Sequence, residues 1–262
     1  MNDNFKTWKN DINKIYSVLE LEKSIVGVKL IKTKKEYDLR EAITLSKPIS
    51  YCQMVRAASN GNVLKAADES FMCRSGARVF GINMSDPQNG KGEKWSRLGL
   101  YKNAEISQTV RNNLTYSTEE QYGILLGPIE KLEIIPDIVL ITANPYNCMR
   151  IVQGYAYHYG MPNSINMIGN QAICLECTAR PYVVQDMNVS LLCIGTRHRA
   201  NWTDNEMAIG LPIKQFHNVV DGLLQTVNIM ESNENKKRIE KKLKDNNIYY
   251  RTRFNYNYYM DC

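Results

Sequence analysis

Residues 136–145 read PDIVLITANP, and this stretch is the clearest strand in the chain. Apolar and β-branched residues fill its centre, Pro136 precedes them, and Asn144-Pro145 ends the run, which is the pattern of a buried strand bounded by turn residues. A second β-branched run, IVGVKLI at 25–31, predicts another buried strand. Strands of this kind between helical segments predict an α/β fold.

Apolar residues at helical spacing lie on both sides of these two strands. Such spacing predicts helices over 5–22, 51–60, 146–159 and 213–231. By contrast, residues 85–97 contain an Asp-Pro step and two glycines, which predict a loop. In TDNEMAIG, we interpret Asp204 and Glu206 as an N-terminal helix cap.

Composition excludes several classes of protein. Hydrophobic residues make up 44% of the 262 residues and charged residues 23%, which is ordinary for a globular domain. No apolar run approaches the ~20 residues of a membrane span. The N-terminus, MNDNFKTWKNDINKIY, lacks the apolar core of a secretory signal, so we expect a cytoplasmic protein. In that reducing compartment the seven cysteines are expected to be free thiols or metal ligands.

The net charge of +6 is not spread as in a nucleic-acid-binding protein. Lys and Arg concentrate at 29–35 and at 236–244, and in the second segment charges of both signs alternate at helical spacing. This alternation is typical of a solvated helix face, so nucleic acid is not an expected partner. We expect the polar, Tyr-rich segment 233–262 to be a helical appendage outside the core.

Two segments of the chain repeat one pattern. YCQMVRAASNGN at 51–62 and ICLECTARPYVV at 173–184 each place an alanine five residues after a cysteine. After similar intervals, a second cysteine follows an apolar pair and enters a Gly-x-Arg turn, Cys73 in one segment and Cys193 in the other. A predicted strand also precedes each unit.

This repetition predicts an internal duplication. We expect one α/β domain over residues 1–232, built from diverged β/α halves at about 12–126 and 127–225 that pack about a pseudo-twofold axis. Equivalent elements face each other across such an axis. The four repeat-related cysteines would then meet: Cys52, Cys73, Cys174 and Cys193.

Four thiolates on one site suit an iron–sulfur cluster or zinc. Structural zinc commonly takes its ligands as Cys-x2-Cys pairs, whereas these four cysteines stand singly on separate elements. We therefore favour an iron–sulfur cluster, of the 4Fe-4S type, over zinc. Such a protein would take a small-molecule substrate or a redox partner protein, and the sequence is compatible with a homodimer.

Residues beside the second cysteine of each repeat are candidates for holding the cofactor. Gly76 and Gly195 would let backbone N–H groups approach the sulfurs and tune their potential. Arg78, Arg197 and His198 would offset thiolate charge or bind an anionic ligand.

Other interpretations of these residues remain open. The four cysteines could be buried core residues, and Cys174 with Cys177 could form a thiol redox pair. A metal-free protein could hold an anionic ligand between the two halves through Arg78, Arg197 and His198. A third role is protein interaction through the tail. His217, on the last amphipathic helix, is interpreted as structural.

Further motifs follow one another along the chain: IVGVKLI, YCQMVRAA, CRSGARVFGI, LGPIEKL, PDIVLITANP, AICLECTARP and LLCIGTRHRANWTDNEMAIGLP. In this order, over roughly residues 12–225, they resemble the domain-of-unknown-function 169 family of archaea and anaerobic bacteria. The chain departs from that family in Arg74-Ser75 and in its Tyr-rich tail.

The resemblance implies which positions matter. It places family cysteines at Cys52, Cys73, Cys174 and Cys193, and Gly-x-Arg and Gly-x-Pro elements at Gly195, Arg197, Gly210 and Pro212. The family has no assigned activity, and its occurrence in anaerobes suits oxygen-sensitive chemistry. Together with the cysteines, this predicts a redox or sulfur-transfer role in anaerobic metabolism.

Overall fold

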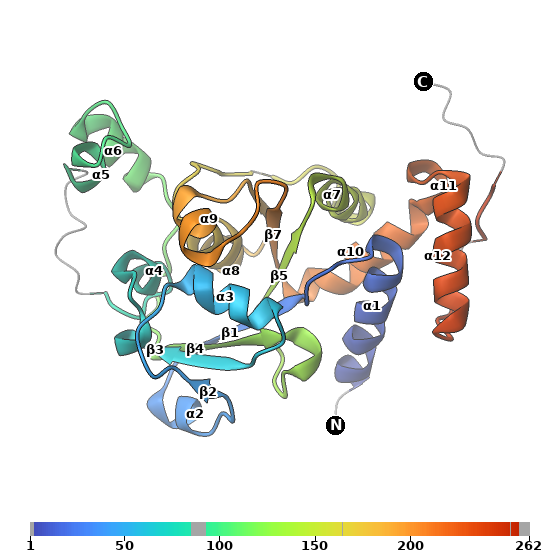
Figure 1. Ribbon diagram of the computed structural model, residues 1–262, viewed down its shortest axis with the longest axis horizontal. Coiled ribbons are helices and arrows are strands. Elements are labelled where there is room, and N and C mark those ends of the chain that lie inside the picture. Colours follow the sequence, from blue (N-terminus) through green and yellow to red (C-terminus); the bar gives the residue numbers. More distant parts are fainter. Residues whose placement is uncertain (1–2, 85–92, 164, 252, 257–262) are drawn as a thin grey trace.

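The computed structural model describes residues 3–84, 93–163, 165–251 and 253–256. Its strands are β1 Val26–Ile31, β2 Ile43–Thr44, β3 Leu64–Ala67, β4 Gly123–Pro128, β5 Ile138–Ala143, β6 Asn188–Ser190 and β7 Met207–Pro212. They form one seven-stranded sheet in the order β2-β3-β4-β1-β5-β7-β6 (Figure 1). Neighbouring strands are antiparallel except for β2 and β3. The predicted mixture of strands and helices is confirmed.

The two strands expected from the sequence, β1 and β5, lie side by side at the centre of this sheet. They are antiparallel, with Val26 opposite Leu140 and Val28 opposite Ile138. On one side β1 is followed by β4 and β3, and on the other β5 is followed by β7 and β6. Over three strands on each side, the order therefore reads alike outward from the β1–β5 pair.

Helices surround the sheet and include a rare π-helix, η4 Ala172–Ala179. The α-helices are α1 Asp3–Leu19, α2 Lys34–Asp38, α3 Tyr51–Ser59, α4 Arg74–Val79, α5 Glu93–Arg97, α6 Ala104–Asn112, α7 Pro145–Tyr159, α8 Arg180–Val184, α9 Ile194–Ala200, α10 Ile213–Gln225, α11 Val227–Met230 and α12 Asn233–Asp245, and two 3-10 turns are η1 Asp68–Ser70 and η3 Ile129–Lys131. The four helices predicted from apolar spacing are confirmed, and the last is interrupted at Thr226, which caps α10.

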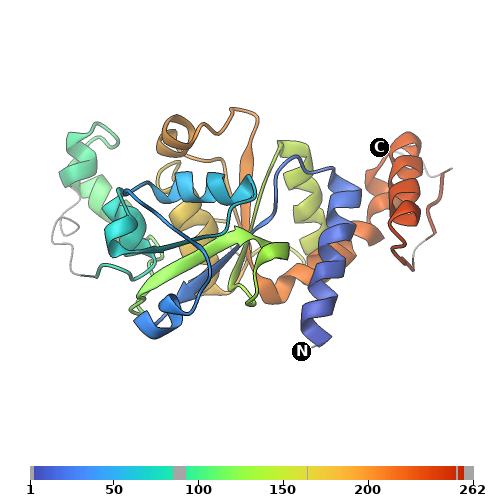
Figure 2. The same ribbon diagram turned by 60° about the horizontal axis from the view of Figure 1, so that its bottom comes forward.

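The two faces of the sheet carry different helices. Residues of α3, α4 and η4 form one buried cluster with strands from both sides of the β1–β5 pair. The opposite face of β5, β7 and β6 is covered by α1, α7 and α10. Figure 2 shows these three helices together, at a distance from α5 and α6. Consequently the helices that carry the repeat-related cysteines share one face of the sheet.

Three local predictions are wrong. Residues 93–97, expected in a loop, form α5, and residues 85–92 lie outside the described residues. Asp204 and Glu206 do not cap a helix, because β7 begins at Met207. The two Gly-x-Arg turns are the first turns of short helices, α4 and α9.

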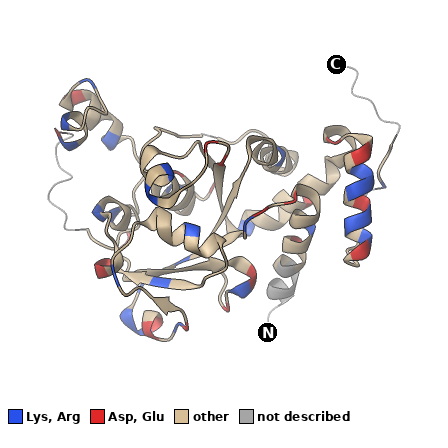
Figure 3. Cartoon of the chain, viewed as in Figure 1, with Lys and Arg blue, Asp and Glu red and all other residues tan. Residues whose placement is uncertain are grey.

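The C-terminal segment is helical as expected but does not lie outside the core. Its helix α12 alternates basic and acidic residues along the outer surface (Figure 3). However, Ile239, Leu243 and Ile248 are buried in the same cluster as Trp8 and Ile12 of α1. Apolar residues at positions 239 and 243 are one helical turn apart, so they form a narrow stripe that the high charge of this segment concealed. No helix in the described part of the chain is long and apolar enough to cross a membrane.

Candidate four-thiol site

The four repeat-related cysteines all lie at or near the beginning of a helix. Cys52 is the second residue of α3, whose N-terminus is fixed by a capping box between Ser50 and Gln53. Cys73 is the N-cap residue of α4, and Cys193 is the N-cap residue of α9. Cys174 lies near the start of η4. Neither N-cap sulfur accepts a hydrogen bond from a backbone N–H in the first turn of its helix.

Hydrogen bonds between the two sides of the sheet bring these helix starts together. The Thr196 hydroxyl lies 3.4 Å from the Cys52 sulfur and 3.2 Å from the Cys193 sulfur, so one oxygen contacts a cysteine from each side. Tyr51, which precedes Cys52, has its hydroxyl 3.0 Å from that of Thr178 in η4. These contacts hold α3 against both α9 and η4.

Burial and the charges of neighbouring thiols raise the pKa values of Cys52 and Cys174. Burial raises the pKa of Cys174 well above that of a free cysteine, and the charges of Cys52, Cys73 and Cys193 raise it further. Burial also raises the pKa of Cys52 to about 11, an effect to which Cys193 and Cys73 add and which the Thr196 hydrogen bond opposes. Without a ligand, Cys52 and Cys174 are therefore neutral thiols at pH 7.

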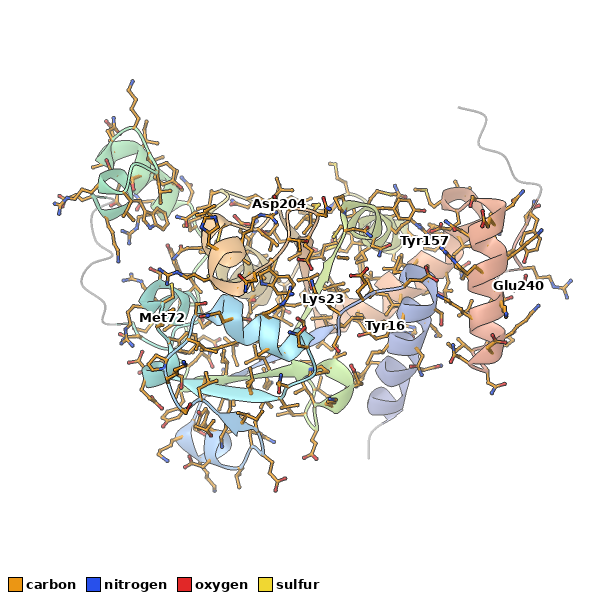
Figure 4. The ribbon with its side chains drawn as sticks, viewed as in Figure 1. Tyr16, Lys23, Met72, Tyr157, Asp204 and Glu240 are labelled. Carbon is orange, nitrogen blue, oxygen red and sulfur yellow. The ribbon has the colours of Figure 1, made fainter. Side chains whose placement is uncertain are left out.

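Access to the four-thiol site differs among its members. Cys174 and Cys193 are buried, whereas Cys52 and Cys73 are partly exposed. The apolar neighbours Met72 and Ile194 are 47% and 62% exposed, and Met72 lies at the edge of the molecule beside α4 (Figure 4). Two of the four thiols are thus partly open to solvent, and exposed apolar side chains adjoin Cys73 and Cys193 in the sequence.

The four thiols are not arranged as a metal site in this conformation. Among the residues that the structure describes, no three His, Cys, Asp or Glu side chains have the geometry of a metal site. Ligation would require rotation of cysteine side chains. Both predicted glycines leave room beside the sulfurs: a Cβ on Gly76 would lie 3.9 Å from the Cys73 sulfur, and one on Gly195 would lie 3.8 Å from the Cys193 sulfur.

The predicted anion-binding side chains do not all face the thiols. Arg197 donates to the backbone carbonyls of Leu191, Thr203 and Glu206, so its guanidinium organises the loop that follows α9. His198 is exposed. Arg78 lies over the Tyr116 ring, 6.0 Å from its centre, and the pKa of Tyr116 responds to both Arg78 and Cys174.

Cys177 and Cys148 lie outside the four-thiol group. Burial is the main cause that raises the pKa of Cys177, followed by the charges of Glu176 and Cys148. Reactive redox cysteines are partly exposed and have lowered pKa values. Cys174 and Cys177 are both fully enclosed with raised pKa values, which does not fit a thiol redox pair.

A buried carboxyl group that the sequence did not reveal connects two of the cysteine-bearing segments. Glu176 of η4 accepts a hydrogen bond of 2.7 Å from the Ile168 N–H and another from the Ser190 hydroxyl. That hydroxyl accepts the Leu192 N–H at 3.0 Å, and Leu192 has the rare φ of 65° directly before Cys193. Glu176 therefore links the turn that carries Cys174 to the turn that carries Cys193.

Neither Glu176 nor Thr196 stood out in the sequence. Thr196 occupies the variable position of the second Gly-x-Arg turn, and the run AICLECTA has no periodicity that separates a π-helix from an α-helix. One feature of the sequence could have identified Glu176: it is a charged residue within a long apolar segment. A fully buried glutamate needs hydrogen-bond partners.

Comparisons with known proteins agree on one family. Residues 14–222 match the model of the family described as DUF169, uncharacterised ArCR. An uncharacterized protein of Methanocaldococcus jannaschii, MJ0308, is 26% identical over 218 residues, covering 82% of this chain and 93% of the relative. No solved structure matches significantly. The chain therefore belongs to the DUF169 family.

Proposed function

We propose that this DUF169 member binds an iron–sulfur cluster through Cys52, Cys73, Cys174 and Cys193. The observation that supports the proposal is geometric: four separate helix starts on one face of the sheet carry these cysteines, and the Thr196 hydroxyl contacts the sulfurs of Cys52 and Cys193. Scattered single cysteines that converge in space suit a cluster better than a mononuclear zinc site. We propose a cytoplasmic location for this protein, because thiols stay reduced in that compartment.

Chemical features of the four-thiol site support a bound anionic cluster. First-turn N–H groups of the helices can donate to cluster and cysteine sulfurs, an interaction that tunes reduction potential. Because Cys52 and Cys174 are protonated in the free protein, loading would release protons. The cluster would supply one-electron redox chemistry or a site for sulfur transfer.

We also infer that the two sides of the sheet are diverged copies. The three strands nearest the centre follow the same order on both sides, and each side contributes one cysteine at or near a helix start and one N-cap cysteine. The copies differ in their insertions: the first carries α2 and the edge strand β2 before its first repeat cysteine and α5 and α6 before β4, and the second carries α7 before its first repeat cysteine. A cluster on the pseudo-twofold axis would take two ligands from each copy.

The proposal is tested by purification without oxygen, reconstitution with iron and sulfide, and analysis of iron, sulfide and zinc. We expect a broad visible absorption band and about four irons per chain. Replacing any one of the four cysteines by Ser should remove most of the band. Cys148→Ser is the matched control, because Cys148 is buried but outside the four-thiol group.

Three outcomes would contradict the proposal. These are a colourless protein after reconstitution, equal loss from Cys148→Ser, and zinc that iron does not displace. Electron paramagnetic resonance of the reduced protein would distinguish a bound cluster from adventitious iron.

A further inference from the structure

A second cavity of about 440 Å³ lies next to the four-thiol site. Its walls come from four segments: 20–23 before β1, Arg56 of α3, 142–147 at the β5–α7 junction, and 203–206 before β7. Two of these segments belong to each side of the sheet. None of its lining residues was singled out as a ligand-binding residue in the sequence.

Two cations of this cavity share one aromatic ring. The Lys23 ammonium lies 4.7 Å from the centre of the Trp202 ring, and the Arg56 guanidinium lies 4.9 Å from it. Both side chains also form ion pairs with Glu206. Figure 4 shows Lys23 beside α3, and its side chain is only 16% exposed.

Three carboxylates line the cavity: Glu206 and Glu20 form ion pairs, and Glu22 is exposed to solvent. Glu206 forms ion pairs with both Lys23 and Arg56, and it also accepts hydrogen bonds from the N–H and hydroxyl of Thr203. Glu20 forms ion pairs with Arg238 and Lys242 of α12. Lys23 and Arg56 together therefore carry one more positive charge than the carboxylate that they share.

A buried donor of Arg56 lacks an acceptor within hydrogen-bond distance. Within the described chain, its Nη1 is buried without a hydrogen bond, and the Glu206 Oε2 with which it forms an ion pair lies 3.9 Å away. Burying such groups unpaired costs about 1–3 kcal/mol each, so native proteins normally pair them with a ligand or water. The N-terminus of the 15-residue helix α7 borders the same cavity through Asn144 and Asn147, and the positive end of a helix favours an anion.

We propose that this cavity binds a small molecule carrying a carboxylate or phosphate group, with Lys23 and Arg56 as its cationic anchors and Trp202 as the platform beneath them. The proposal does not depend on a bound cluster. It differs from the anionic site expected in the sequence, because neither Arg197 nor His198 takes part. Burial, and next the charge of Arg56, lower the pKa of Lys23 to about 8, as expected for a cation crowded by another.

The cavity is placed for a ligand that reacts at the thiols. Arg56 lies four residues after Cys52 on α3, one helical turn along the same side. Trp202 follows α9, which begins at Cys193. A ligand held between α3 and the segment after α9 would extend from its charged end toward the four-thiol site.

Binding is measured by calorimetric titration of the metal-free protein with inorganic phosphate and, separately, with malonate, at constant ionic strength. We expect saturable binding of one probe, weakened at least about tenfold in both Arg56→Gln and Lys23→Gln, a loss of about 1.4 kcal/mol. Lys32→Gln is the matched control, because Lys32 is an exposed cation at the opposite end of β1 from Lys23 and pairs with Glu119. Preference for phosphate or for malonate identifies the acidic group.

A second measurement uses the wild-type protein and so does not depend on folding of the variants. Lysines are acylated with and without the probe, and the modified peptides are quantified by mass spectrometry. The probe should slow acylation of Lys23 several-fold and leave Lys32 unchanged. Absence of saturable binding by both probes, or equal binding by all variants with no protection of Lys23, would overturn the proposal.

Discussion

The two sides of the central sheet differ in how deeply they bury equivalent cysteines. On the β1-β4-β3 side, Cys52 and Cys73 are partly exposed. On the β5-β7-β6 side, Cys174 and Cys193 are only 5% and 7% exposed. Solvent and ligands therefore reach the four-thiol site from the first side. The second side contributes the buried part of the site.

Packing explains this difference. The second side has helices on both faces, η4 and α9 on one and α7 and α10 on the other. The outer face of the first side is covered by the short helix α2 and the loop around Leu132. Close packing on both faces leaves the second side less freedom to move, so we expect it to hold its two thiols rigidly.

The largest expected effect concerns the contact between η4 and β7. A Cβ on Gly210 would lie 1.8 Å from the Cys177 carbonyl oxygen, a backbone atom that cannot turn away. Gly210→Ala should therefore destabilise the protein by more than about 4 kcal/mol or prevent folding. The change is measured by urea unfolding followed by circular dichroism.

Gly195→Ala is the control for this substitution. Its Cβ would meet only the Cys193 sulfur, at an ordinary 3.8 Å, and alanine is favoured over glycine in a helix. Its stability should stay within about 1 kcal/mol of wild type. Equal effects of the two substitutions would mean that η4 does not rest on β7 as described.

The second prediction compares the thiols of the two sides directly. In metal-free protein, iodoacetamide should modify Cys52 and Cys73 before Cys174 and Cys193, because only the first two are partly exposed. With a pKa of about 11, Cys52 is about one-thousandth thiolate at pH 8, so its rate should rise about tenfold per pH unit up to that pKa. Peptide mass spectrometry over a pH series gives each rate.

Protection by iron and sulfide supplies the control for this labelling experiment. Loading should slow modification of all four cysteines together. Modification of Cys174 ahead of Cys52 would show that access is from the second side.

Sequence patterns predicted the part of this architecture that depends on periodicity. The central strands and the long helices followed from apolar spacing, and the cysteines were grouped by comparing YCQMVRAASNGN with ICLECTARPYVV. What the sequence did not reveal depends on contacts between distant segments. Glu206, misread as a helix cap, instead pairs with Lys23 and Arg56, which lie more than a hundred residues earlier. The π-helix and the bridging hydroxyl of Thr196 likewise exist only through packing of one side on the other.

The third prediction concerns Glu176, which links the segments that carry the buried thiols Cys174 and Cys193. Burial raises the pKa of this carboxyl group, so in the folded protein its protonated form is favoured. Stability from this group is present below its unfolded pKa and is lost as pH rises through the folded value. Glu176→Gln, which cannot ionise, should therefore cost about 1–3 kcal/mol near pH 5 and less near pH 8.

Asp137→Asn is the matched control for Glu176→Gln, since Asp137 is a partly exposed carboxylate that pairs with Lys29 and accepts the Leu30 N–H. Its cost at each pH is the reference for a carboxylate that is not fully buried. Paired urea titrations at several pH values measure both variants. A cost for Glu176→Gln that grows with pH would show that the carboxylate, not the acid, is the form that holds Cys174 and Cys193 in place.

The smallest effects compare an arginine from each side. Arg197 donates to three backbone carbonyls around the loop that follows α9, and such hydrogen bonds from a charged group are worth about 1.5–3 kcal/mol. Arg74 is 48% exposed and pairs with Asp68 at the surface, where a salt bridge contributes at most about 1 kcal/mol. We expect Arg197→Gln to lower the free energy of unfolding by about 1–2 kcal/mol and Arg74→Gln by less than half of that.

Urea unfolding in low and high salt separates the two, because only the Arg74 effect should fade with screening. If Arg197→Gln instead left stability unchanged and abolished binding of an anionic probe, its guanidinium would belong to a ligand rather than to the loop.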